Sequence, residues 1–187
     1  MGRMTEIADR YRSLADAFEA KVAAVRPDEW SNPSPCEQWS ARDVVGHVID
    51  VHGMMLRPLG VELDGGPSVQ DDPLGAFRAA RADLQAVLDD PSRADTEYDG
   101  AFGRTTVSAT VDQFMGFDLV VHGWDLARAT GQDEAVPPAE VDRVLAFVER
   151  LGTQTMQDNG VTGPEVAVPD DAPAQDRMLG LLGRDPR

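Results

Sequence analysis

The chain has 187 residues and a formal net charge of −16, from 33 acidic and 17 basic residues. A surface of that charge repels nucleic-acid backbones and anionic lipid headgroups, which argues against nucleic-acid and membrane partners. The length suits one domain with its own hydrophobic core, so we expect residues 1–187 to form a single domain.

The N-terminal segment and the cysteine content point to an intracellular setting. The first residues, MGRMTEIADRYRSLADAFEA, are charged and amphipathic and lack the apolar core of a signal peptide. No apolar run approaches the roughly 20 residues needed to cross a bilayer. The single cysteine, Cys36, cannot form an internal disulfide. We therefore expect a cytoplasmic protein.

The first two predicted helices flank a proline-rich connection. Residues 4–25 carry apolar side chains at the three-to-four spacing of an amphipathic helix. Residues 32–35, Asn-Pro-Ser-Pro, predict an irregular connection, with the flanking tryptophans packed on the core. Ser40 and Asp43 form a variant of the capping box, which begins a second helix. This helix is apolar nearly all round, so we expect it to be buried on several sides.

Two further helices are predicted around a second irregular segment. A helix begins at Pro73, capped by the preceding aspartate, and ends at residues 89–91, Asp-Asp-Pro. Residues 95–107 contain two glycines between short β-prone ends, which predicts a loop or a small hairpin. The next helix covers residues 108–130 and ends at Gly131.

The remaining residues predict a fifth helix and a loop-rich tail. Pro137 and Pro138 begin the helix, and the tail after Gly160 ends in an apolar segment, MLGLLG, that we expect to dock as one last turn. Four or five antiparallel helices with loops of moderate length indicate an all-α fold. The expected architecture is an up-and-down four-helix bundle with an extra helix and loop segments.

Three side chains on two of these helices are candidate metal ligands. His47 lies midway along the second predicted helix, and Asp118 and His122 lie one turn apart on the fourth. Residues four apart share a helix face, so Asp118 and His122 point the same way. A carboxylate and an imidazole facing a third ligand from another helix make a plausible divalent-metal site. For each histidine alone, the alternative is a core residue bonded to a backbone carbonyl.

Three residues near the candidate ligands have open or secondary roles. His52 falls on a different helix face from the first histidine, and we expect it at the bundle surface or the rim of a pocket. Asp125 follows His122 by three residues and either accepts a hydrogen bond from its imidazole or pairs with a basic group such as Arg128. Cys36 is expected to be an inert, small hydrophobic residue.

Two sequence motifs resemble a known family. The run PSPCEQWSARDVVGHVIDVH resembles the signature of the DinB-like proteins of actinobacteria, and more closely that of the N-terminal domain of mycothiol-dependent maleylpyruvate isomerase. The runs FDLVVHGWDLARATGQD and VPDDAPAQDRMLGLLGRDP are similar to the same group. The resemblance implies a four-helix bundle whose divalent metal is held by His47, Asp118 and His122. Asp118 stands where the isomerase has a glutamate.

The resemblance also implies a function. In related members the metal activates a low-molecular-weight thiol, mycothiol or bacillithiol, for transfer to an electrophile. We therefore expect a metal-dependent thiol transferase or isomerase with mycothiol as cofactor and a small-molecule substrate. The alternatives are a non-catalytic bundle that binds a metal or small ligand, and a structural bundle without metal. Two imidazoles and a carboxylate suit Zn, which we expect, or Ni, Fe or Mn. A homodimer is compatible with the resemblance.

Overall fold

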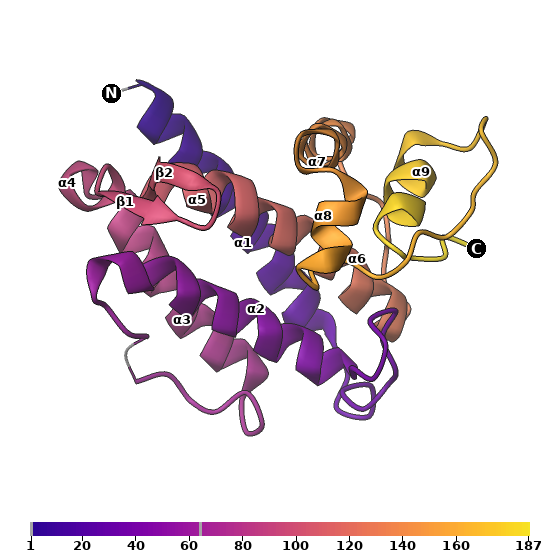
Figure 1. The fold of residues 1–187 in the computed structure, drawn as a ribbon. Coiled ribbons are helices and arrows are strands. Elements are labelled where there is room, and N and C mark those ends of the chain that lie inside the picture. Colours follow the sequence, from indigo (N-terminus) through magenta and orange to yellow (C-terminus); the bar gives the residue numbers. More distant parts are fainter. Residues whose placement is uncertain (1, 64) are drawn as a thin grey trace. The chain divides into compact units, whose positions relative to one another are not determined.

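The computed structural model describes residues 2–63 and 65–187. The chain forms two compact units, Met1–Asp133 and Glu134–Arg187. Helices account for most of the secondary structure in both units (Figure 1). The predicted helical class is therefore confirmed, whereas a single domain over residues 1–187 stays a prediction.

The first unit combines long helices with shorter elements, one after the second long helix and the rest between the third and the last. The long helices are α1 (Gly2–Ala24), α2 (Ala41–Leu56), α3 (Pro73–Leu88) and α6 (Gly116–Thr130). The shorter elements are a 3-10 turn (Arg57–Leu59), α4 (Pro91–Ala94), β1 (Glu97–Gly100), β2 (Gly103–Thr106), α5 (Val107–Thr110) and a π-helical turn (Val111–Met115). Strands β1 and β2 pair in antiparallel register, so the hairpin alternative is confirmed.

Local capping signals begin and end these helices where the sequence predicts. The Ser40 side chain accepts a hydrogen bond from the Asp43 backbone N–H, and the Asp43 carboxylate accepts one from the Ser40 N–H at 2.8 Å. Asp72 caps α3 by accepting from the Gly75 N–H at 2.9 Å. Gly131, at φ 65°, ends α6 in the left-handed conformation that glycine adopts without strain.

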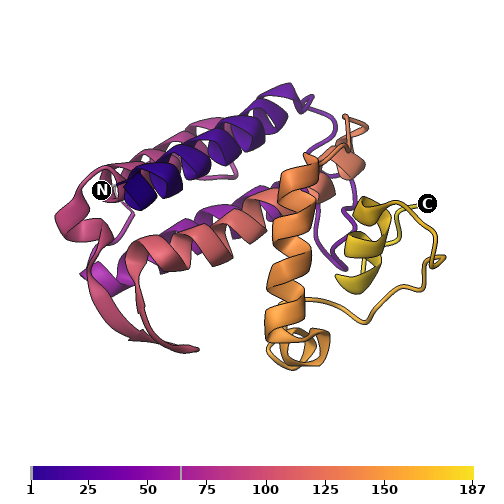
Figure 2. The same ribbon diagram turned by 90° about the horizontal axis from the view of Figure 1, so that it is seen from above.

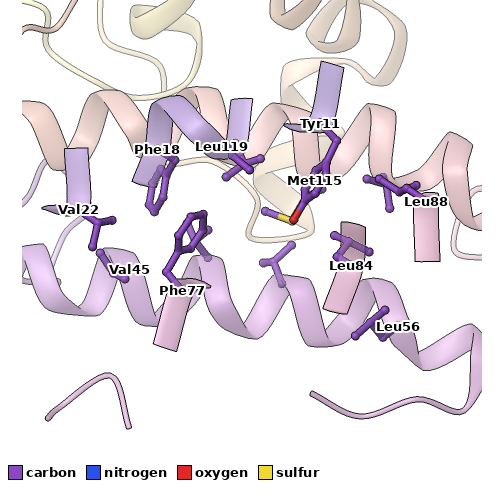
Figure 3. Packing of buried hydrophobic residues seen from close by; sticks show 14 of the residues in the cluster. Tyr11, Phe18, Val22, Val45, Leu56, Phe77, Leu84, Leu88, Met115 and Leu119 are labelled. Carbon is purple, nitrogen blue, oxygen red and sulfur yellow. The ribbon is translucent and has the colours of Figure 1, made fainter. Parts of the chain in front are cut away.

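The consecutive helices α2 and α3 run parallel. Figure 3 shows Val45 and Phe77 near one end of the core, with Leu56 and Leu84 toward the other. The directions of the other helix pairs lead to the same conclusion. Helix α6, which lies beside α2 (Figure 2), runs antiparallel to it and parallel to α1. Helix α3 runs antiparallel to α1, as two ion pairs between them show.

The connection between α2 and α3 explains this arrangement. Helix α2 has 16 residues, which makes it about 24 Å long at 1.5 Å per residue. Residues 57–72 can extend to about 50 Å, enough to return the chain along the whole of α2 before α3 begins. The predicted up-and-down order is therefore wrong for this pair, because the crossover is long enough to reverse the expected direction.

The second unit contains three helices within the part of the chain that the structure describes: α7 (Pro138–Leu151), α8 (Thr153–Asp158) and α9 (Ala174–Leu181). The prolines begin α7 as predicted. The apolar tail segment forms much of α9, and its side chains Met178, Leu179 and Leu182 are fully buried. In neither unit does a described helix combine the length and the apolar character that a membrane span requires.

Candidate metal centre

Helices α2 and α6 bring the three predicted ligands together. His47 Nε2 lies 3.2 Å from Asp118 Oδ2, and His122 Nε2 lies 3.8 Å from Asp118 Oδ1. One potential ligand atom from each residue lies within 4.8 Å of the other two. The Asp118 carboxylate therefore lies close to both imidazoles, whose ring centroids are 4.8 Å apart. It shares a face of α6 with His122, as the four-residue spacing predicts. Their role as metal ligands stays a prediction.

One oxygen of the Asp118 carboxylate is buried without a hydrogen-bond donor among the described residues. The Asp118 side chain is only 14% exposed. The Oδ2 atom is buried and, among the residues that the structure describes, accepts no hydrogen bond, since His47 lies close to it but outside hydrogen-bonding geometry. A buried carboxylate oxygen without a donor is unfavourable unless a cation compensates it. The observed site therefore fits a bound cation.

A buried hydrogen bond fixes the orientation of the His122 ring. His122 Nδ1 lies 2.9 Å from Oδ2 of Asp125, whose side chain is fully buried. A carboxylate accepts only from a protonated ring nitrogen, so Nδ1 carries a proton, and Nε2 is the nitrogen that faces Asp118. This confirms the first of the two roles predicted for Asp125. Arg128 lies over the ring of Trp124, 4.8 Å from its centroid.

Trp39 is a site residue that the sequence did not reveal. Its ring centroid lies 4.8 Å from that of His47 and 5.9 Å from that of His122. It sits at the end of the proline-rich connection, which is tied to α6 by a hydrogen bond from the Asn32 side chain to the Ala129 carbonyl, at 2.9 Å. The indole thereby covers both imidazoles and restricts their rotation. No spacing within one helix could show this contact.

Cys36 belongs to a second polar cluster beside the first. Its Sγ lies 3.2 Å from Asp125 Oδ2 and 4.0 Å from His122 Nδ1, so the thiol donates to the carboxylate oxygen that His122 also uses. The expected role as a small hydrophobic residue is therefore wrong, whereas the expected lack of reactivity stays a prediction. The proline-rich connection folds back onto α6 and brings together residues that are 86 positions apart.

His52 lies in the core, so its predicted place at the surface or a pocket rim is wrong. Its Nδ1 is 2.7 Å from the Val48 carbonyl, and its Nε2 is 2.9 Å from the Tyr11 hydroxyl. Helix α1 covers this face of α2 and supplies the hydroxyl. Complete burial lowers the pKa of His52 to about 4, so the ring is neutral at physiological pH. His52 belongs to neither candidate ligand cluster.

The fold and the cluster define a mostly helical domain with a candidate metal site between two of its helices. The family model of the mycothiol maleylpyruvate isomerase N-terminal domain matches residues 11–127, and the chain belongs to this family. This confirms the family that the motifs predicted. The matched residues include the three candidate ligands, as well as Cys36 and Asp125.

Two relatives from Mycobacterium tuberculosis extend the similarity beyond the matched domain. They are the uncharacterized proteins MT0763, from strain CDC 1551 / Oshkosh, and Rv0738, from strain ATCC 25618 / H37Rv. Each is 28% identical to this chain over 181 residues, which cover 95% of the chain and 97% of the relative. The similarity therefore includes the second unit. No solved structure matches the chain significantly.

Proposed function

We propose that this protein is a DinB-like, metal-dependent thiol transferase or isomerase that uses mycothiol, with His47, Asp118 and His122 as the metal ligands. The observation that carries the proposal is the Asp118 carboxylate beside two imidazoles, with one buried oxygen that has no hydrogen-bond donor among the described residues. Membership of the mycothiol maleylpyruvate isomerase N-terminal domain family supports the choice of thiol.

The donor set fits a divalent cation of intermediate softness. Two imidazole nitrogens and a carboxylate oxygen suit Zn, which we propose as the resident ion, although Ni, Fe and Mn accept the same ligands. When bound, the cation would lower the pKa of a thiol that coordinates it and so supply a sulfur nucleophile near neutral pH. In a transfer, the thiol gives its proton to solvent, sulfur bonds to the electrophilic carbon, and the leaving group departs with its bonding pair. In an isomerisation, the substrate's double-bond pair moves away from that carbon as sulfur adds and returns when the thiol leaves.

The chain's own residues prepare the site for this reaction. Asp125 keeps a proton on Nδ1 of His122 and so keeps Nε2 available as a ligand. Trp39 packs on both imidazoles and holds them in place without adding a charge. We propose a small-molecule electrophile as the substrate and no nucleic-acid or membrane partner, in keeping with the acidic composition.

Metal content tests the site. We expect protein purified without an affinity tag or added metal to carry about one equivalent of divalent metal by mass spectrometry, and the His122→Ala variant to carry almost none. His52→Ala is the matched control, because it removes a buried histidine outside the cluster. A wild-type protein that stays free of metal after reconstitution with Zn, Ni, Fe and Mn would contradict the proposal.

Thiol consumption then tests the reaction. Metal-loaded protein is mixed with mycothiol and a panel of electrophiles, and loss of free thiol is followed against the His122→Ala variant. We expect loss that depends on His122 for at least one electrophile. Stoichiometric metal without any thiol consumption would favour the alternative, a non-catalytic bundle that binds a metal or small ligand.

A further inference from the structure

The π-helical turn lies directly before the helix that carries two of the proposed ligands. Residues 107–130 keep a helical backbone through α5, the π-turn (Val111–Met115) and α6. A π-turn holds one more residue than an α-turn, so everything after it is rotated by about 100° relative to an uninterrupted α-helix. Asp118 and His122 follow the turn closely, so this rotation determines which way they point.

The hydrogen bonds at the turn involve a side chain from α1. The Gly116 N–H donates to the carbonyls of Val111 and Gln113 rather than to that of Asp112, which it would use in an α-helix. Arg10 Nη1 instead donates to the Asp112 carbonyl at 2.7 Å and to the Asp112 carboxylate, also at 2.7 Å. One guanidinium nitrogen thus binds both the backbone and the side chain of a residue within the turn.

Gly116 lets the guanidinium approach the helix this closely. A Cβ atom on Gly116 would lie 2.6 Å from Arg10 Nη1 and 3.0 Å from Arg10 Nη2. The Arg10 side chain is only 15% exposed, and the Asp112 carboxylate pairs with its charge. A largely buried, paired guanidinium that donates to a carbonyl in the turn is expensive to displace. Arg10, Asp112 and Gly116 therefore form one lock on the π-turn.

We propose that Arg10 is a positioning residue for the metal centre. By holding the π-turn, it sets the rotation of α6 that directs Asp118 and His122 toward His47. The inference rests on the proposed function, because it assumes that these side chains bind a metal. It adds a residue on α1, which contributes no ligand, to the set that determines metal affinity.

The test measures Co²⁺ binding to the full chain by chelator competition and by the visible spectrum of the bound ion, which reports its ligand geometry. We expect Arg10→Met to weaken binding about 10- to 100-fold, the range seen for residues that orient metal ligands, and to alter the spectrum. Arg10→Lys, which keeps the charge and a single donor nitrogen, should recover part of the affinity. Arg12→Met is the matched control, since Arg12 lies on the same helix in an exposed ion pair.

A double-mutant cycle of Arg10→Met and Gly116→Ala distinguishes the effect of the Arg10 contact on metal binding from a general loss of stability. Gly116→Ala should also weaken Co²⁺ binding, because the new methyl displaces the guanidinium. Combined with Arg10→Met it should add little, since no guanidinium remains to displace. Free energies of unfolding without metal, from urea titrations, show whether affinity changes beyond what stability explains.

The outcomes distinguish the two proposals. A wild-type protein that binds no Co²⁺ overturns the proposed function, and the inference with it. Wild-type affinity and spectrum in Arg10→Met overturn the inference alone, even if that variant unfolds more readily. Should Arg10→Met fail to fold, Arg10→Lys and Gly116→Ala decide: unchanged affinity and spectrum in both also overturn it.

Discussion

Two histidines of the first unit are almost fully buried, yet their surroundings differ in one decisive respect. Both ring nitrogens of His52 have partners within the protein, the Val48 carbonyl and the Tyr11 hydroxyl. Among the residues that the structure describes, His122 has such a partner only at Nδ1, which contacts Asp125, while its Nε2 faces Asp118, 3.8 Å away. Burial alone therefore does not separate a structural histidine from a candidate ligand. The partner of the second nitrogen does.

We expect the largest effects on metal content and stability when His122 or His52 is replaced by alanine. His122→Ala should lose almost all of the bound metal, and it should also lower the unfolding free energy of the metal-free protein, because the fully buried Asp125 carboxylate loses a donor. His52→Ala should keep the metal but lose about 2–4 kcal/mol of stability, because it leaves a cavity and a buried tyrosine hydroxyl without a partner. Metal analysis and urea unfolding check both. Equal metal loss in the two variants would erase the distinction between the histidines.

Lowering the pH should reduce the free energy of unfolding, because His52 is held neutral in the folded protein. Burial lowers its pKa from the usual 6.5 to about 4 in the folded protein. Between these pH values the unfolded chain binds a proton at His52 and the folded chain does not, so stability is lost as the pH falls through this window. The shift corresponds to at most about 3 kcal/mol. Urea unfolding at pH 7 and pH 4 should show this extra loss in the wild type relative to His52→Gln, which cannot titrate. Parallel losses in the two proteins would show that folding does not lower the pKa of His52.

Asp125→Asn tests whether the hydrogen bond to His122 Nδ1 contributes to metal affinity. An amide is a weaker acceptor than a carboxylate, so the ring loses the partner that fixes its proton and its orientation. We expect metal affinity to fall about 10- to 100-fold, which is about 1.4–2.7 kcal/mol. Competition with a chelator measures it, and Cys36→Ser, which leaves a donor next to the same carboxylate, serves as the control. Unchanged affinity in Asp125→Asn would rule out an orienting role.

Tyr11→Phe should give the smallest effect. It removes the hydroxyl bonded to His52 Nε2 and leaves the aromatic packing in place. The expected loss is about 1 kcal/mol in the unfolding free energy, with metal affinity unchanged. Weaker metal binding in this variant would mean that the two histidines are coupled through the core.

Features set by neighbouring residues could be predicted from the sequence. The capping box at Ser40, the start of α3 after Asp72 and the end of α6 at Gly131 each depend on side chains within a few positions. The convergence of Asp118 and His122 on one face follows from helical periodicity in the same way. These elements were sufficient to name the three candidate ligands.

Features set by distant contacts could not be predicted. The parallel direction of α3 accompanies its packing against α1 and α2, and the π-turn accepts a hydrogen bond from Arg10, a residue of another helix. Periodicity places His52 on a face of α2 but cannot say that Tyr11 covers it. Cys36 reaches Asp125 only because the connection before α2 folds back on α6. In each case the missing information was the identity of the neighbouring element.

The crossover at residues 57–72 divides the chain so that His47 precedes it while Asp118 and His122 follow it. In the proposed holoprotein the ion would bind ligands from both segments of the polypeptide and so link them. If the chain were cut in the crossover, the two fragments would associate more tightly as the metal concentration rises. The reason is that the metal binds the associated fragments and not the separate ones. Reassembly of the split protein would thus become a readout of site occupancy.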